Sequence, residues 1–408
     1  MSDSKKILYF IKRFNISRFS HLSSSSKNMV SKIVNIMEQA VKTYNKHTWS
    51  NSILNVSHTF PKGKNYANVV KEIKEEFENQ SKVGKQYSFT IGSRKFKIYL
   101  IKPLIGSQNP ISIYKMLDKM IYRIYIWLFV CNHFSSPMCS PNISVYIYMT
   151  NHKKLLPEID HKPLDEIHAN TAFTFACPLT SNEIYVFRNE EWFKVFIHES
   201  FHCFGLDFAT LPEEEAEKNM FSIFPVACNL RFYETYTEIW AEIINVIFIS
   251  VNNYPCKENT IDIHKLSKII ENHLYNEQIF SLFQCSKVLH HLGLKYRELY
   301  QTTEHAKRIR HERYKENTHV FSYYILKCII IFHYNDFIEW CVKNNNGSIQ
   351  FIKTQENIYS LFQFIKEKYN SSEYLRTIDI FENWFWLSNQ ENQNGKMEVE
   401  TMRMSISE

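Results

Sequence analysis

The chain of 408 residues lacks any long apolar run that is free of charge. Its most apolar stretch, residues 111–130, carries Lys115, Asp118, Lys119 and Arg123 at helical intervals. A helix that crosses a bilayer needs about 18 or more apolar residues with few or no charges. We therefore expect a buried amphipathic helix in this stretch and no membrane span.

Closely spaced cysteine pairs are also missing. The nine cysteines are an odd number, lie far apart and include no Cys-x-x-Cys pair. A secretory signal is not evident either, because the apolar residues 7–11 are too few for its core and are followed by Lys12 and Arg13. These absences predict reduced thiols and a cytoplasmic, reducing compartment instead of a disulfide framework.

A strong excess of either charge is absent as well. The formal net charge is +6, which is mild for this length and does not by itself indicate a nucleic-acid-binding protein. The basic run at residues 307–315 is typical of a solvated helix face. Binding of nucleic acid through residues 306–315 and the basic N-terminus is an alternative that stays open.

The pattern of apolar residues predicts the fold class. Hydrophobic residues make up 44% of the chain, which is enough for a large core. Alternation predicts a hairpin over residues 87–100 and a strand over 143–149, with a helix at 111–133 between them. Strands, a long helix, more strands and then helices are the order of an α+β fold.

We expect four segments along the chain. These are a flexible basic and Ser-rich arm (1–28), an α+β domain (29–250), a mainly α-helical lobe (251–388) and a disordered polar tail (389–408).

The most informative motif is His198-Glu199-Ser200-Phe201-His202. On a helix, positions four apart lie on one face, so His198 and His202 can hold one metal ion. Glu199 then lies beside the ion, where it can act on a bound water. The pattern predicts a zinc site with the two histidines as ligands and Glu199 as general base.

The surroundings of this motif favour a helix. Residues 183–187 are rich in aromatic and β-branched side chains and predict a strand just upstream. Glu190 and Glu191 fall at the expected start of the helix, where acidic residues are favoured. Gly205 follows His202 at the expected end.

A catalytic zinc site has a third protein ligand, for which the sequence offers several candidates. Glu234, Glu238 and Glu242 form one acidic stripe on an apolar helix without Lys or Arg to offset it. Asp207 is a further candidate. It is a weaker one, because it lies five residues after His202, one residue short of the spacing that a ligand directly after the motif requires. An alternative is that the histidines are ordinary core residues and that the glutamates pair with Lys or Arg from elsewhere.

The motif and the later acidic helix resemble the gluzincins, the thermolysin-like zinc peptidases, over roughly residues 183–245. The resemblance implies that Glu238 is the third zinc ligand and that Glu242 orients His198. Thr237 stands where that family often has Asn. The composition is also similar to that of zincin-like proteins of large DNA viruses, which implies a host cytoplasm or a virion as the setting.

The resemblance implies a zincin-like catalytic domain with one Zn²⁺, acting on a peptide or protein. It also implies an oxyanion donor from the second lobe, for which His319, Tyr323 and Tyr324 are candidates. Residues 172–176 or 183–187 are expected to form an edge strand that can pair with an extended peptide. The alternative is that both strands are internal. A zincin without catalytic activity, serving as a structural or host-interaction protein, is the alternative.

Overall fold

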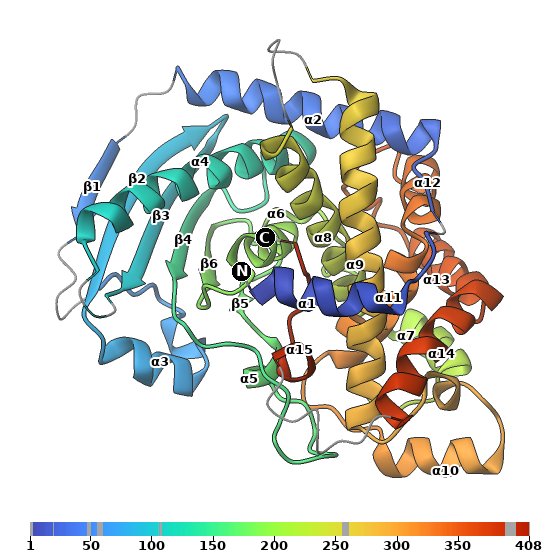
Figure 1. Ribbon diagram of the computed structural model, residues 1–408. Helices are drawn as coiled ribbons and strands as arrows, with labels where there is room; N and C mark the ends of the chain where they lie inside the picture. Colours follow the sequence, from blue (N-terminus) through green and yellow to red (C-terminus); the bar gives the residue numbers. More distant parts are fainter. Residues whose placement is uncertain are drawn as a thin grey trace.

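The computed structural model describes most of the chain. The described residues are 3–18, 20–46, 50–54, 60–104, 106, 108–254, 261–387 and 397–407. One open sheet and many helices give an α+β fold, as the sequence predicts (Figure 1).

The sheet has six strands. They are β1 (Ser50–Leu54), β2 (Lys82–Ile91), β3 (Arg94–Pro103), β4 (Asn142–Tyr148), β5 (Ala172–Phe173) and β6 (Ser181–Val186).

The helices of the first half of the chain are α1 (Asp3–Ile11), α2 (Ser24–Tyr44), α3 (Lys71–Glu78), α4 (Pro110–Phe134), α5 (Glu166–Ala169), α6 (Trp192–Phe204), α7 (Glu214–Ile223) and α8 (Phe232–Asn252). Those of the second half are α9 (Ile263–His291), α10 (Glu304–Arg313), α11 (Lys327–Phe332), α12 (Tyr334–Asn344), α13 (Gln355–Lys368), α14 (Ser372–Leu387) and α15 (Met397–Glu400). Short helical turns are η1 (Lys12–Phe14), η2 (Tyr66–Asn68), η3 (Tyr296–Leu299) and the π-helical η4 (Phe321–Leu326).

The strand order is β1-β2-β3-β4-β6-β5, with β3, β4 and β6 parallel and the outer pairs antiparallel. The predicted hairpin is confirmed as β2 and β3, and Gly92 adopts the positive φ of 59° that its tight turn requires. The predicted helix is confirmed as α4, which begins at Pro110 because the Asn109 side chain accepts from Ile111 N. The strand predicted over 143–149 is β4.

Helices cover one face of the sheet, and an aromatic cluster lies on the other. Trp127 of α4 stacks on Phe201 of α6 at 5.9 Å between ring centroids, so both helices pack on the same side. On the other face, Tyr99, Tyr146, Tyr185 and Phe173 form a ladder of stacked rings across β3, β4, β6 and β5. Cross-strand aromatic pairs of this kind stabilise a sheet. Both faces of the sheet are therefore covered, one by helices and the other by the aromatic cluster, and β5 lies at the edge of the sheet.

The second half of the chain is helical, as predicted. Helices α9 and α11–α14 gather beside α8, opposite the sheet in Figure 1. One apolar core continues from the helices on the sheet through α8 into this region. The division at residue 250 stays a prediction. Within the described residues, no helix is both long and apolar enough to cross a membrane.

The expectation of a flexible arm at residues 1–28 is wrong for residues 3–18 and 20–28, which the structure describes. Helix α1 buries Ile7 and Ile11 completely, because residues four apart share a helix face. Ser23, from the serine run, caps α2 by accepting from Ser26 N, so this run is a helix start instead of a linker.

The expectation of a disordered tail also fails for residues 397–407. Helix α15 is followed by residues 401–406, all of which are buried. Met402, Met404 and Ile406 enter the apolar core at alternating positions, and Arg403 between them donates to Ser4 Oγ of α1 at 2.9 Å. Residues 389–396 and Glu408 lie outside the described part of the chain.

Candidate metal centre

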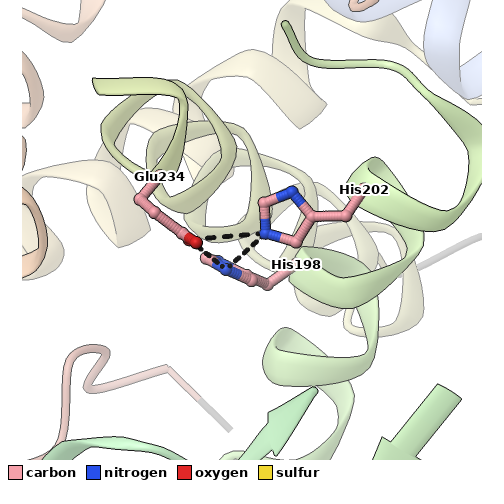
Figure 2. Close-up of side chains that lie close together, drawn as sticks. All are labelled: His198, His202 and Glu234. Carbon is pink, nitrogen blue, oxygen red and sulfur yellow. Dashed lines mark hydrogen bonds and ion pairs between the residues drawn. The ribbon is translucent and has the colours of Figure 1, made fainter. Parts of the chain in front are cut away.

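Helix α6 carries the two histidines, as predicted. It begins after Glu191, which adopts a positive φ of 56°, and ends at Gly205, with a φ of 63°. Histidines 198 and 202 lie one turn apart and are both buried. Their Nε2 atoms point at each other across 3.1 Å (Figure 2).

Glu234 of α8 completes the group. Its Oε2 atom lies 3.0 Å from His198 Nε2 and 3.3 Å from His202 Nε2 (Figure 2). Two metal–nitrogen bonds of about 2.0–2.1 Å at a tetrahedral angle hold their nitrogens about 3.3 Å apart. The three side chains therefore form a buried group that can hold one metal ion.

The assignment of Glu238 as third ligand is corrected by this geometry. Glu238 lies one turn further along α8, where its Oε2 atom is 2.9 Å from His198 Nδ1 and its Oε1 atom contacts Lys194 Nζ. It therefore contacts the nitrogen of His198 that faces away from the group. Residues 234, 238 and 242 share one helix face, and their spacing alone does not show which lies opposite the histidines.

Glu242 does not contact His198 either. It is fully buried and forms an ion pair with Lys327 Nζ at 3.0 Å. The alternative that glutamates of this stripe pair with lysines from elsewhere thus holds for Glu238, with Lys194, and for Glu242.

Asp207 orients His202. Its Oδ2 atom contacts His202 Nδ1 and accepts from Thr237 Oγ1 at 3.3 Å, while its Oδ1 atom accepts from Ala209 N at 3.1 Å. The structure thus assigns Asp207 to the outer nitrogen of His202 instead of the metal group. Carboxylates on Nδ1 of both histidines direct both Nε2 atoms to a common point, as in many metal sites.

When no cation is present, the side chains of this group hold protons strongly. Burial alone would lower the pKa of His202, but Glu234 and Asp207 raise it well above its ordinary value. Burial would raise the pKa of Glu234, but the two imidazoles lower it well below its ordinary value. A metal ion that occupies this point must displace protons.

Glu199 lies beside the group on α6 and is only 7% exposed. Burial raises its pKa to about 7, against the opposing effect of the two imidazoles. A carboxyl with this pKa can exchange a proton near neutral pH, which is what a general base requires.

The group opens onto a cavity of about 390 Å³. One wall is the segment of residues 169–176, which contains the edge strand β5. Buried Arg188 holds the start of this wall, because it donates to the carbonyls of Asn170 at 3.1 Å and Ile167 at 2.6 Å. Of the two strands proposed as the cleft edge, β5 lies at the edge and β6 is internal.

The oxyanion candidates differ in their positions. Tyr323 lines the cavity, and its ring lies 6.0 Å from that of His198. His319 also lines the cavity but contacts the carbonyl of Asn229 through Nδ1 at 3.2 Å. Tyr324 points away, donating to Met402 O at 2.6 Å.

Sequence reasoning missed Tyr233, Arg231, Lys194 and Met404, which also line the cavity. Tyr233 and Arg231 directly precede Glu234, and Arg231 donates to Tyr233 Oη at 2.8 Å. Lys194 precedes His198 by four residues, so its place on the same face was readable from the motif. Met404 has no local signal, because it reaches the site from the far end of the chain.

The prediction of thiols alone is wrong for one pair of cysteines. Cys139 and Cys177 form a disulfide, while six other described cysteines are free. The wide spacing of the cysteines in the sequence gives no sign of this pair, which the fold brings together next to Gly205. Cys177 N also donates to His202 O at 3.0 Å, which ties the cavity wall to α6. The reducing compartment stays a prediction that this bond does not support.

Comparisons with protein-family models, with curated proteins and with solved structures found no match for this chain.

Proposed function

We propose that this protein is a zinc-dependent peptidase. The observation that carries the proposal is the convergence of His198, His202 and Glu234 on one point beside buried Glu199, at a cavity walled by an edge strand. This arrangement combines a metal-binding group, a general base and a place for an extended substrate.

Two histidines and one glutamate are a donor set typical of catalytic zinc. When bound, the ion would lower the pKa of its water to about 7 and polarise a carbonyl group. In the gluzincin pattern, Glu234 would be the zinc ligand, and Glu238 would be the acid that orients a zinc-binding histidine. The chain would thus still resemble the gluzincins, with the ligand and the orienting acid each one helical turn earlier on α8 than the sequence predicts.

Glu199 supplies the proton transfer in this proposal. Its carboxylate accepts a proton from the attacking water and returns it to the leaving amine. Burial helps, because water does not compete for the proton in the buried site.

Tyr323 is the donor that the geometry favours for the developing oxyanion. Burial and then the nearby carboxylates, Glu234 first, raise its pKa well above its ordinary value, so it keeps its O–H proton at neutral pH. His319, a partly buried residue that also lines the cavity, is the second candidate. An extended peptide would lie along residues 172–176 and pair with the free edge of β5.

Nucleic-acid binding receives less support. In the basic run on α10, Lys307 pairs with Glu304 at 2.7 Å, and Arg310 donates to the carbonyls of Pro225 and Gln301. Two cations of this run, Lys307 and Arg310, thus bind groups of the protein itself.

A screen against a mixture of short peptides tests the catalytic proposal. We expect the zinc-loaded protein to cleave members of the mixture and Glu199→Gln to lower the rate roughly 100- to 10,000-fold with its zinc retained. Glu215→Gln, an exposed acid on α7, serves as the matched control and should cleave normally. Zinc-loaded protein that cleaves no peptide would favour the non-catalytic alternative, and full activity of Glu199→Gln would exclude the assigned base.

A further inference from the structure

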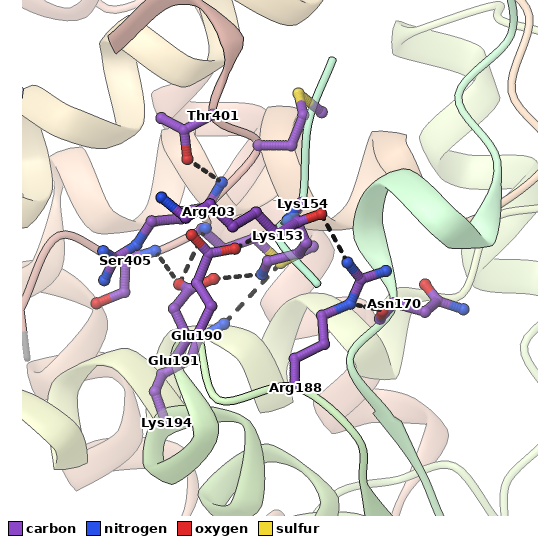
Figure 3. Close-up of polar contacts among 12 residues, drawn as sticks. Lys153, Lys154, Asn170, Arg188, Glu190, Glu191, Lys194, Thr401, Arg403 and Ser405 are labelled. Atoms are coloured by element: carbon purple, nitrogen blue, oxygen red, sulfur yellow. Dashed lines mark hydrogen bonds and ion pairs between the residues drawn. The ribbon is translucent and has the colours of Figure 1, made fainter. Parts of the chain in front are cut away.

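The C-terminal segment, residues 401–407, packs beside the metal group, and its residues 401–406 are buried. It runs between the start of α6 and helices α9 and α11, and Figure 3 shows Arg403 and Ser405 among buried charged side chains. Met404 from this segment reaches the cavity wall. The far end of the chain thus meets the residues around the histidines.

Side chains of the surrounding helices bind the backbone of this segment as they would bind an extended peptide. On α9, Glu277 accepts from Ile406 N at 3.0 Å and from Ser407 N at 2.8 Å. On α11, Lys327 Nζ donates to Met404 O at 2.8 Å. Because Glu277 and Lys327 are buried, the segment provides partners that water cannot replace.

Glu191 links the segment to the start of α6. It accepts from Met404 N at 3.0 Å and from Ser405 N at 2.6 Å, and it forms an ion pair with Lys154 (Figure 3). Glu191 is the residue directly before α6, so the segment holds one end of the helix that carries the histidines.

Lys194 links the segment to the histidines themselves. Its Nζ atom lies 3.9 Å from Met404 Sδ and contacts Glu238 Oε1. The other oxygen of Glu238 is 2.9 Å from His198 Nδ1. Lys327, which donates to Met404 O, pairs with Glu242 on the next turn of α8.

We propose that the C-terminal segment is a positioning element of the metal centre. Through these buried contacts, Met404 and its neighbours fix Lys194 and Lys327, and these lysines fix Glu238 on His198. Without the segment, Glu191, Glu277 and Lys327 would lose partners in a buried site, and the buried charges would rearrange around Glu238. The proposal rests on the zinc site of the proposed function.

Met404→Ala in the chain of 408 residues tests this link, because it removes the contact with Lys194 and leaves the backbone bonds in place. We expect the zinc affinity of the folded protein, measured by competition with a chelator, to fall about 10-fold or more, as for other groups that orient ligands. The visible spectrum of the Co²⁺-substituted protein should change as well, because it reports ligand geometry. Met404→Leu, which refills the volume, should restore most of the affinity.

Met120→Ala on α4 is the matched control, since Met120 is a buried methionine that does not line the cavity. Both alanine variants should lower the unfolding temperature, but only Met404→Ala should lower the zinc affinity. Equal zinc affinities and unchanged Co²⁺ spectra in Met404→Ala and the natural protein would overturn the positioning role. Absence of zinc binding by the natural protein would instead refute the proposed function.

Discussion

At the scale of single residues, the centre depends on which nitrogen of each histidine faces inward. Glu238 holds Nδ1 of His198 and Asp207 holds Nδ1 of His202, which leaves both Nε2 atoms for a metal ion. The neighbouring acids therefore have separate tasks, and Glu234 is the one whose oxygen meets both Nε2 atoms.

The role of Asp207 leads to a first prediction. Asp207→Asn keeps the shape but removes the charge that orients His202, so we expect zinc affinity to fall about 10- to 100-fold. Competition with a chelator measures this. Asp379→Asn makes the same change at the surface of α14, where Asp379 pairs with Arg297, and should leave zinc affinity unchanged. Equal affinities in both variants would exclude the orienting role.

The proton affinity of the group leads to a second prediction, for the metal-free protein. The pKa of His202 is raised above its unfolded value of about 6.5, so its ion pairs stabilise the fold below that pH and are lost as pH rises through the folded pKa. The pKa of Glu234 is lowered, so its contribution is lost as pH falls through its folded value. Stability should therefore be greatest between these limits.

Zinc should extend this range upward, because it replaces the protons that leave at high pH. Thermal unfolding across pH 4 to 9 with and without zinc measures both effects. An increase in zinc stabilisation with rising pH is expected. Stabilisation that is independent of pH would contradict competition between zinc and protons.

At the scale of elements, the site depends on where α6 ends. Gly205 ends the helix at a positive φ, and a Cβ atom there would lie 3.0 Å from both Cys139 Sγ and Cys177 Cβ. The end of the helix, the disulfide and the cavity wall therefore meet at one crowded point, and a glycine is required there for space as well as for conformation.

Gly205→Ala is therefore expected to lower the free energy of unfolding by roughly 2–4 kcal/mol, which combines backbone strain with overpacking. Gly347→Ala is the control, because Gly347 has a φ of 60° but a Cβ atom there would have no described neighbour within 4 Å. Strain alone should make it cost about 1 kcal/mol. Chemical denaturation measures both values, and equal losses would contradict the crowding at Gly205.

The sequence was sufficient for α6 and for β2, β3, β4 and β6, because helical and alternating patterns are local signals, but it did not predict β1. It was not sufficient for the choice among Glu234, Glu238 and Glu242, which depends on how far α8 slides along α6. Apolar residues on every side of α8 permit several such positions. The contact of Asp207 with His202 was likewise not readable, since it depends on the turn after Gly205.

At the scale of the whole molecule, the first and last described segments of the chain both contribute side chains to the apolar core. Composition predicted a flexible arm at residues 1–28, because that segment is basic and rich in serine, and a disordered tail at 389–408, because that segment is polar. Their apolar residues are few but regularly placed, as in Ile7 and Ile11 or Met402 and Met404, and they enter the core. Composition averages over such positions, whereas burial depends on each one.

The disulfide shows the same limit. Cys139 and Cys177 are 38 residues apart, and only the completed sheet brings their loops together. The α+β class, by contrast, follows from the order of elements, which the sequence contains directly.

The most direct test of the account is the zinc content of the protein purified without chelators, compared with that of Glu234→Ala. We expect about one zinc per chain in the natural protein and in the surface control Glu215→Ala, and a sharp loss in Glu234→Ala. Glu238→Ala should retain zinc at weaker affinity. A natural protein without zinc would contradict the central claim, as would full zinc content in Glu234→Ala.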